Sequence, residues 1–502
     1  MLWFLLLLVL LLVFVAFRDL TQNTHAILKN FPIIGHFRYW LEEIGPELRQ
    51  YIVTDNDEER PFSRDQRRWV YSSAKKQNNY FGFGTDNDLE ESPNYLIIKH
   101  AAFPLADIHD SEYSIPAAKI MGGYRKRKKA FRPNSIINVS AMSFGSLSAP
   151  AIEALNKGCK IAGSLHNTGE GGISKYHKSG GDLIWQIGTG YFGCRNKDGS
   201  FNWDMFLENA KLEQVKAIEI KLSQGAKPGL GGVLPAEKVT AEIAQARGIE
   251  IGEGCISPSS HSVFNDIDSM LDFVEEIADK TGLPVGIKSA VGEIDFWREL
   301  AQKMKDTNRG VDFITIDGGE GGTGAAPLAF SDHVSLPFKL GFSRVYKEFA
   351  KLDMQDNVVF IASGRLGFPE EALFAFALGA DMINVAREAM LAIGCIQAQR
   401  CHNNHCPTGV ATQNKWLIRG LDPTDKAARL ANYFIMFRKE VLRLSHACGL
   451  EHPALITNKH LEVINDDYSS QSIYEIFDYQ DTWGLPDKRA AEEIKGIMLE
   501  QN

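Results

Sequence analysis

From about residue 130 onward, short apolar runs alternate with stretches of helical spacing. The runs have the length and composition of buried strands and lie at 136–142, 164–168, 183–188, 217–222, 284–289, 313–317, 358–363 and 381–386. Helices are expected between most of them, at 149–162, 203–212, 236–245, 267–280, 295–305, 334–350 and 369–379. Because parallel strands need crossovers of this kind, the alternation predicts an α/β fold, a (βα)8 TIM barrel rather than an open sheet.

Further regions flank the barrel in this chain of 502 residues. We expect a helical and irregular region over 18–95, irregular from 53 onward, the barrel over 96–420, and a C-terminal helical extension over 421–502. The extension contains an amphipathic helix at 426–448 and is expected to pack on the barrel. In the N-terminal region, apolar side chains recur at helical spacing at Phe37, Trp40, Leu41, Ile44, Leu48, Tyr51 and Ile52.

The first seventeen residues, MLWFLLLLVLLLVFVAF, are uncharged and lie at the short end of the range for a membrane span. A signal peptide is the less favoured interpretation, because no basic region precedes the run and no small-residue cleavage site follows it. Arg18, Lys29 and Arg38 follow the run. Residues 1–17 are therefore predicted to be a single-pass transmembrane anchor that keeps the catalytic body on the cytoplasmic side.

Charge and cysteine content argue against a nucleic-acid-binding protein and against a disulfide-rich protein. The net charge is −9, and the basic run RKRKK at 125–129 is short, which argues against nucleic acid as a partner. We interpret that run as a solvated loop or a contact with acidic lipid headgroups. Seven cysteines in a chain of this length do not form a disulfide framework, so a reducing compartment is expected.

Three of the cysteines, Cys395, Cys401 and Cys406, lie in one short run, with five and then four residues between them. Thiolates at this spacing are suited to an iron–sulfur cluster, and three ligands suit a cluster of three irons. Two alternatives remain: a zinc site that uses His402 or His405, and three buried small hydrophobic side chains.

Polar groups follow several of the predicted strands, at the end where a barrel places its active site. The turns Ser363-Gly364-Arg365 and Ala386-Arg387 follow the seventh and eighth strands, a usual phosphate site, although ordinary turns with surface arginines have the same pattern. Lys288 ends the fifth strand, where a cation would stabilise the negative charge of a reduced flavin.

Three glycine-rich loops extend this set of polar groups. Asp317, Gly318 and Gly319 open a loop after the sixth strand that would lie flat against a ring. Gln224 and Lys227, after the fourth strand, are candidates to bind a carboxylate, and Glu170, after the second, is a candidate acid or ammonium ligand. Ser259, Ser260 and His261 are interpreted as capping or surface residues rather than as part of this cleft.

The segment 135–415 resembles the FMN-binding synthase domain of the glutamate synthase family, in a short stand-alone form. The motifs that carry the resemblance follow in family order: SAMSFGSLS, HNTGEGG, EIKLSQGAKPGLGG, SPSSHS, GIKSAVGE, IDGGEGGTGAAP and CIQAQRCHNNHCPTGVATQ. The resemblance implies a (βα)8 barrel that carries FMN and a 3Fe–4S cluster. Its chemistry is the reduction of 2-iminoglutarate, formed from 2-oxoglutarate and ammonia, by hydride from the flavin.

The resemblance also implies roles for individual residues. The cluster ligands would be Cys395, Cys401 and Cys406, and Gln224 and Lys227 would bind the oxo acid. Lys288 would stabilise the reduced flavin, and Glu170 is our candidate partner for a proton or ammonia. The FMN contacts would be Ser140, Ala141, Met142, Gln186, Lys288, Asp317, Gly318, Gly319, Ser363, Gly364, Arg365, Ala386 and Arg387.

The chain departs from the family pattern mainly in the substrate region. Leu230 and Val233 stand where the family commonly has Glu and Gln, Ile173 replaces a Glu, and Tyr191 falls where the family uses an arginine on the substrate carboxylate. An alternative is therefore a different amino or oxo acid on the same scaffold, or a membrane-associated electron-transfer module without a small substrate.

Two parts of the larger glutamate synthases are not expected in this chain. We find no N-terminal cysteine nucleophile with a glutamine amidotransferase region, and no G-x-G-x-x-G unit for a dinucleotide after the barrel. The expected electron donor is therefore ferredoxin, another protein or a membrane redox protein.

Overall fold

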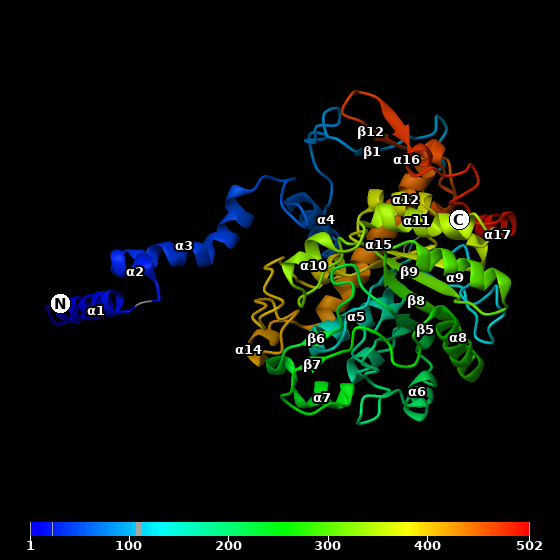
Figure 1. Cartoon of the computed structure of the whole chain (residues 1–502). Helices are drawn as coiled ribbons and strands as arrows, with labels where there is room; N and C mark the ends of the chain where they lie inside the picture. The colour runs from blue at the N-terminus through cyan, green and yellow to red at the C-terminus, as the bar shows by residue number, and fades with distance from the viewer. Residues whose placement is uncertain (1, 23, 107–112, 501–502) are drawn as a thin grey trace. The chain divides into compact units, whose positions relative to one another are not determined.

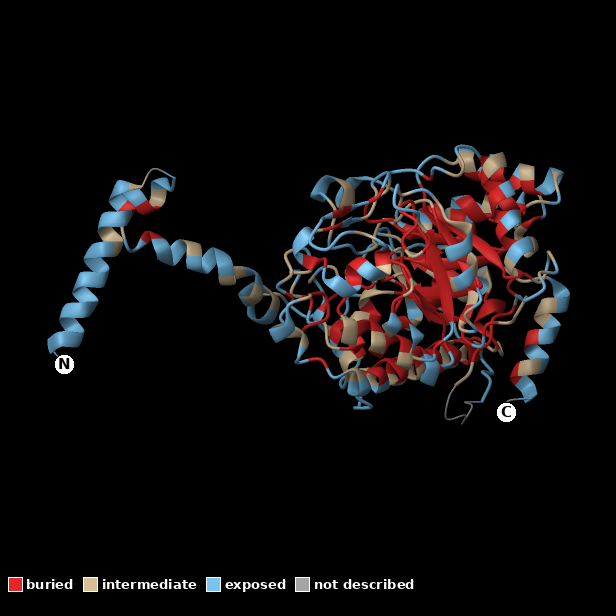
Figure 2. Cartoon of the chain, turned by 90° about the horizontal axis from the view of Figure 1, so that it is seen from below, coloured by how far each residue is buried: buried red, intermediate tan, exposed pale blue. Residues whose placement is uncertain are grey.

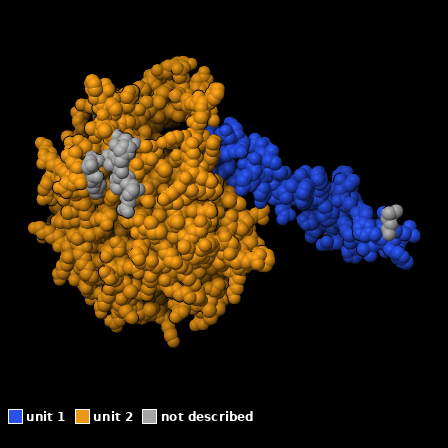
Figure 3. All heavy atoms as spheres, turned by 180° about the vertical axis from the view of Figure 1, so that it is seen from behind, with its two compact units in different colours: residues 1–67 blue, residues 68–502 orange. Residues whose placement is uncertain are grey.

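The computed structural model describes residues 2–22, 24–106 and 113–500. Met1 of the predicted anchor, 107–112 of the predicted barrel range and 501–502 of the predicted extension lie outside the described residues. The chain divides into two compact units, Met1–Arg67 and Arg68–Asn502 (Figure 3). The domain boundaries that the sequence suggested stay predictions.

Eight parallel strands of the second unit close into a barrel, in the order β10-β11-β2-β3-β4-β5-β8-β9. Figure 1 labels β5, β8 and β9 of this barrel. Each corresponds to one of the strands predicted from the sequence, so the predicted fold class is confirmed. The strands are β2 (Ile137–Val139), β3 (His166–Asn167), β4 (Leu183–Ile187), β5 (Val215–Lys221), β8 (Val285–Ala290), β9 (Phe313–Asp317), β10 (Val359–Ser363) and β11 (Met382–Val385).

The barrel strands are apolar because helices cover their outer side while side chains fill the interior. Every residue of β4, β8, β9, β10 and β11 is buried, which Figure 2 shows as the red centre of the second unit. The helices that follow the strands are α5 (Ala149–Ala162), α6 (Trp203–Ala210), α7 (Ala241–Arg247), α8 (Ile267–Thr281), α9 (Asp295–Asp306), α10 (Leu328–His333), α11 (Phe338–Ala350), α12 (Pro369–Ala377) and α13 (Arg387–Ala392).

The long helix α15 (Pro423–Ala447) completes the helical layer by packing against α5 and α12. Its contact with α5 is close, because a Cβ atom on Gly158 would lie 2.7 Å from Leu430 Cδ2. The amphipathic helix expected at 426–448 is thus present and packs on the barrel. Helix α4 (Arg64–Ala74) begins in the first unit and ends in the second. Smaller elements complete the second unit: β1 (Tyr95–Ile98), β6 (Val233–Leu234), β7 (Cys255–Ile256), α14 (Lys415–Ile418), β12 (Leu461–Ile464), β13 (Ser470–Ser472), α16 (Ile473–Phe477) and α17 (Lys488–Glu500).

One expectation from the sequence is wrong, and a second holds only in part. Part of the supposedly irregular stretch 53–95 forms α4, where Trp69 packs with ring centroids 6.0–6.2 Å from Phe368, Tyr433 and Phe437. The helix is stabilised by residues distant in sequence, which its own charged sequence does not reveal.

The basic run 125–129 is a solvated loop only in part, because Lys126, Lys128 and Lys129 are exposed whereas Arg125 and Arg127 bind within the protein. Arg125 donates to the carbonyls of Val311 and Asn357, at 2.8 and 3.1 Å. Arg127 forms ion pairs with Asp312 at 3.0 Å and Glu275 at 2.6 Å. Two of the five cations therefore serve internal packing, because buried carboxylates and carbonyls need such partners.

The first unit contains α1 (Leu2–Thr21), α2 (Ala26–Asn30), α3 (Gly35–Leu48) and the π-helical turn η1 (Arg49–Val53). Among the described residues, α1 is the one helix that is long and apolar enough to cross a membrane, a test that a signal sequence also passes. Its length of about 30 Å matches a hydrocarbon core. Most residues of α1 are exposed in the first unit and are pale blue in Figure 2.

Candidate active site

Three of the predicted cofactor residues meet where β8, β9 and β10 end. Lys288 Nζ lies 3.4 Å from Asp317 Oδ2, and Ser363 donates to Asp317 Oδ1 at 2.7 Å. All three are buried. Because parallel strands end at the same rim of the barrel, residues far apart in sequence form one charged group there.

Asp317 also joins the loop after β9 to the loop after β5. Its Oδ2 accepts a hydrogen bond from the backbone N–H of Gly225 at 2.9 Å. The two loops touch closely, since a Cβ atom on Gly225 would lie 1.8 Å from the carbonyl oxygen of Gly318. The predicted cofactor residues and the predicted substrate loop are therefore in direct contact.

Two guanidinium groups lie close together after β10 and β11. Burial lowers the pKa of Arg387, the nearby Arg365 lowers it further, and Glu388, Asp317 and Glu320 oppose this. Arg365 has a φ of 58° and follows Gly364, whose φ is 148°, so this turn adopts a backbone that side chains rarely favour. Paired arginines beside a strained turn suit a phosphate dianion, so the residues present fit the phosphate of FMN.

The loops after β2 and β3 pack directly on each other. Ser140 and Met142 are buried, Ala141 is partly buried, and a Cβ atom on Gly169 would lie 2.7 Å from the amide nitrogen of Ser143. Ser140 donates its N–H to the carbonyl of Val385 at 2.8 Å, the residue before Ala386. The predicted FMN contacts Ser140, Ala141 and Met142, in the loop after β2, thus lie at the same rim as the arginines.

Glu219, on β5, is a buried carboxylate that sequence analysis missed as a site residue. Its Oε1 accepts from Gln186 Nε2 at 2.6 Å and Asn167 Nδ2 at 2.7 Å, and its Oε2 accepts from Thr315 Oγ1 at 2.6 Å. The four side chains belong to β3, β4, β5 and β9 and tie these strands together inside the barrel. The available signal was a charged residue inside the apolar run AIEIKL.

The predicted substrate residues gather around Lys221, which sequence analysis also missed. Lys221 Nζ donates to Glu170 Oε1 at 2.5 Å and to Gln224 Oε1 at 2.7 Å. Burial alone would raise the pKa of Glu170, but Lys221, Lys227 and Arg247 outweigh it and hold the pKa below its usual value. Burial lowers the pKa of Lys227, whose Nζ donates to the carbonyl of Gly231 at 3.0 Å. The group thus contains an ionised carboxylate between two lysines.

Tyr191 is buried and its hydroxyl is already engaged. It accepts from the N–H groups of Ser262 at 3.0 Å and Val263 at 3.3 Å, and it lies 3.2 Å from His261 Nδ1. His261 is buried rather than on the surface, and its Nε2 donates to the carbonyl of Lys221 at 2.9 Å. Because that nitrogen carries the proton of the neutral ring, the Tyr191 hydroxyl donates to Nδ1.

The cysteine loop follows α13 beside this rim. Burial raises the pKa of the Cys401 thiol, Cys406 adds to the rise, and Lys238 opposes it, so these two thiols and one lysine are neighbours. Lys238, which sequence analysis missed, donates to the carbonyl of Cys401 at 2.7 Å. Tyr71 donates to the carbonyl of Cys395 at 2.8 Å. Within the described part of the chain, no three His, Cys, Asp or Glu side chains are gathered as a metal site. Three cysteine thiols are the donor set that an iron–sulfur cluster takes, so the chemistry of these side chains fits such a cluster.

Two arginines after the last two strands, the buried Lys221 at the end of β5 and the buried Lys227 after it make the rim of this (βα)8 barrel a candidate cofactor site. A model described as the conserved region in glutamate synthase matches residues 107–451. The chain is 37% identical over 487 residues to the "Glutamate synthase large subunit-like protein YerD" of Bacillus subtilis (strain 168), covering 90% of this chain and 92% of that protein. The chain therefore belongs to the glutamate synthase family, as its motifs predicted.

More distant relatives cover less of either chain. The "Archaeal glutamate synthase (NADPH)" of Methanocaldococcus jannaschii is 33% identical over 342 residues, 68% of this chain and 64% of that protein. Among solved structures, a flavocytochrome b2 with benzoylformate is 13% identical, with a TM-score of 0.44 over 79% of this chain and 78% of that one. A mandelate oxidase with (S)-mandelic acid is 14% identical, with a TM-score of 0.43 over 75% of this chain and 86% of that one.

Proposed function

We propose that this chain is an FMN-dependent oxidoreductase of the glutamate synthase type, which reduces 2-iminoglutarate, formed from 2-oxoglutarate and ammonia, to glutamate. The observation that carries the proposal is Asp317, which pairs with Lys288 and binds the backbone of Gly225. A cofactor held by the first contact would lie next to a substrate held by the loop of the second. Membership of the glutamate synthase family supports the same reaction.

When bound, FMN would supply a hydride to the imine carbon. Arg365 and Arg387 would hold its phosphate, together with the turns at Ser363-Gly364 and Ala386. Lys288 stabilises the negative charge of the reduced ring, and Asp317 fixes the position of that ammonium group. The remaining contacts come from the loops that carry Ser140, Ala141, Met142, Gly318 and Gly319, and from Gln186.

The substrate's charges match the group around Lys221. Lys227 and Lys221 are cations for the carboxylates of a diacid, and Gln224 offers an amide. Glu170 stays ionised at neutral pH because its pKa is held low, so it binds ammonium or the iminium cation rather than giving up a proton. Lys227, whose pKa is lowered by burial, is the better proton donor to the substrate nitrogen.

We further propose a 3Fe–4S cluster on Cys395, Cys401 and Cys406, which would carry single electrons from ferredoxin or a membrane redox protein. Residues 1–17, of which 2–17 lie in α1, would anchor the chain in a membrane with the catalytic body in the cytoplasm. Spectroscopy of anaerobically purified protein tests the cluster, since each Cys→Ser change should remove its signal and leave the flavin spectrum. Resistance of the full chain to alkaline extraction from membranes tests the anchor.

The test of the reaction is anaerobic reoxidation of the reduced holoprotein. The flavin spectrum is followed after mixing with 2-oxoglutarate and ammonium together, and with each alone. Rapid reoxidation that needs both compounds and yields glutamate is the expected result. Unchanged flavin with both compounds present would refute the proposed substrate while leaving the cofactors intact.

A second candidate is the reduction or oxidation of another amino or oxo acid. Two observations favour it: the Tyr191 hydroxyl is engaged by His261 and by backbone N–H groups, and Leu230 and Val233 are 37% and 45% exposed. These positions offer no charge to a second carboxylate. A panel of monocarboxylic and dicarboxylic oxo acids with ammonium distinguishes the candidates by which one reoxidises the flavin. An electron-transfer module without a small substrate would respond to none of them.

A further inference from the structure

The first unit carries an apolar helix face that the described residues of this unit leave largely exposed. Phe37, Trp40, Leu41, Ile44 and Leu48 of α3 fall within an arc of about 100° on a helix of 3.6 residues per turn. Phe37 is 59% exposed and Trp40 is 52% exposed. We name these five residues the α3 apolar face. Tyr51 and Ile52 of η1 extend it, and both are exposed as well.

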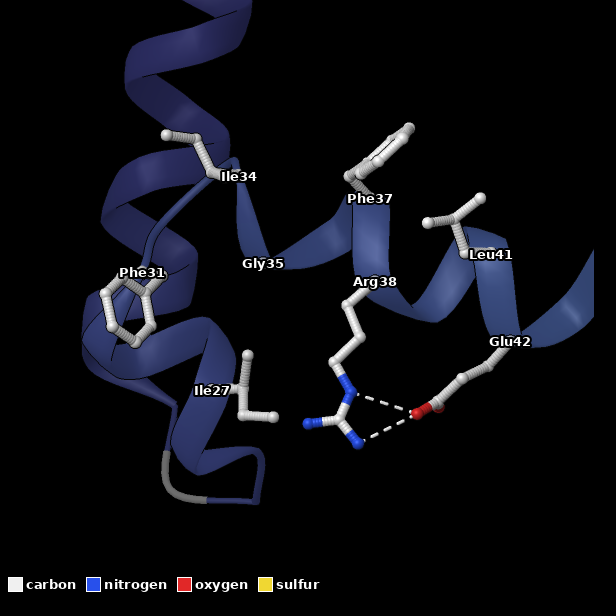
Figure 4. Close-up of a pocket in the computed structure, with 8 residues that line it drawn as sticks. All are labelled: Ile27, Phe31, Ile34, Gly35, Phe37, Arg38, Leu41 and Glu42. Atoms are coloured by element: carbon white, nitrogen blue, oxygen red, sulfur yellow. Dashed lines mark hydrogen bonds and ion pairs between the residues drawn. The ribbon is translucent and has the colours of Figure 1, made fainter.

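The charged residues of α3 lie off this face. Arg38 and Glu42 form an ion pair of 2.9 Å, and in Figure 4 they meet on a side of the helix that Phe37 and Leu41 do not occupy. Phe31, Ile27 and Ile34 line an open pocket beside them. Over 26–53, three cations (Lys29, Arg38, Arg49) balance three anions (Glu42, Glu43, Glu47). With no net charge over 26–53, this surface would bind an apolar partner without preferring a positively or a negatively charged one.

The start of α3 is fixed to the end of α1. Asp19, near the end of α1, is buried and accepts from the N–H of Ile33 at 2.9 Å and from His36 Nε2 at 2.9 Å. The approach of α2 to α3 is also close, since a Cβ atom on Gly35 would lie 3.0 Å from Leu28 Cδ2. The α3 apolar face therefore begins next to the residues at which α1 would leave a bilayer.

We propose that the α3 apolar face lies in the interfacial layer of a lipid bilayer, as a second membrane contact beside α1. We infer that the α3 apolar face contacts lipid because it begins where the span of α1 would end. Trp40 and Tyr51 are also of the residue types enriched at membrane interfaces. The balanced charge makes this contact apolar rather than dependent on anionic headgroups. The inference rests on the anchor proposed for residues 1–17.

The test uses the full-length holoprotein in lipid vesicles, with the photoreactive residue p-benzoylphenylalanine placed at single positions. Phe37 and Trp40 report the α3 apolar face, and Glu43 is the matched control on the charged side of the same helix. Leu8, in the middle of α1, reports the span separately. Irradiated protein is analysed by mass spectrometry for lipid adducts and for crosslinks to protein.

Lipid adducts at Phe37 and Trp40, at least about fivefold above Glu43, are the expected result. Vesicles of phosphatidylcholine alone and vesicles that also contain phosphatidylserine should give yields within about twofold. Crosslinks to protein, whether to the same chain or to a second copy, would overturn the inference, as would adducts that require phosphatidylserine. Lipid adducts at Leu8 without any at Phe37 and Trp40 would refute this contact alone. Absence of lipid adducts at Leu8 would refute the anchor itself.

Discussion

Replacing Glu219 by alanine should destabilise the barrel far more than replacing it by glutamine. Alanine leaves the amide groups of Asn167 and Gln186 and the hydroxyl of Thr315 without their acceptor inside the barrel. Each unsatisfied buried donor costs about 1–3 kcal/mol, and allowing for rearrangement the sum is about 4 kcal/mol.

Glutamine keeps one oxygen for the two amides. Its new NH2 group faces the Thr315 hydroxyl, which can turn and accept. The loss of charge-assisted hydrogen bonding is offset by the removal of a buried charge, so Glu219→Gln should cost only about 1 kcal/mol. The contrast between two substitutions at one position separates hydrogen bonding from charge.

The assay is thermal unfolding of both variants at one scan rate, with and without added FMN. With an unfolding entropy of about 2.1 cal/mol/K per residue, a unit the size of 68–502 should lose about 4 °C in Tm for Glu219→Ala and about 1 °C for Glu219→Gln. Gln186 loses its hydrogen bond to residue 219 only in Glu219→Ala, so the affinity for FMN should fall in that variant and not in Glu219→Gln. The reasoning is refuted if Glu219→Ala melts within about 1 °C of the unaltered chain, or if both variants lose the same amount.

Three further predictions concern the loops. Gly225→Ala places a Cβ atom against the Gly318 carbonyl, so the free energy of unfolding should fall by about 3 kcal/mol. Denaturant titration measures this change. An unchanged midpoint would show that the two loops separate easily. Glu170 has a lowered folded-state pKa, so its contribution to stability is present above pH 4.5 and is lost as the pH falls below it. Glu170→Gln should therefore flatten the acid side of a plot of Tm against pH, and an unaltered slope would count against the ion pair with Lys221. Lys227→Ala should reduce turnover on the oxo acid by roughly 100-fold, about 2.7 kcal/mol, without slowing reduction of the flavin. Lys175→Ala, at an exposed position, is the control and should change neither turnover nor reduction of the flavin.

The sequence predicted the barrel because its strands are local features. Each strand is a short apolar run, and the helical spacing between runs is visible within about fifteen residues. Helix α4 was not predictable in this way, because Trp69 is stabilised by Phe368, Tyr433 and Phe437, which are distant in sequence. Hydrophobic periodicity in the sequence indicates the conformation of one element but not which distant residues will stabilise it.

Within the site, the motifs predicted which residues gather but not how they are paired. The group of Lys288, Asp317 and Ser363 follows from strand ends, whereas the central place of Lys221 depends on the path of the loop after β5. Charge alone also misled at 125–129, where Arg125 and Arg127 bind inside the protein. The spacing of the cysteines indicates a donor set, but it does not determine how far apart the sulfur atoms lie.

The contact between Gly225 and Gly318 bears on how such a chain changes over generations. A backbone oxygen occupies the volume where a side chain at position 225 would begin, and the Asp317 carboxylate binds the same peptide unit. A substitution at Gly225 or at Asp317 therefore disturbs both loops. The loop that would select the substrate and the loop that would hold the cofactor therefore cannot change independently at this contact. A lineage that acquires a new substrate is expected to change residues farther along the substrate loop, such as Leu230 and Val233, before it changes Gly225.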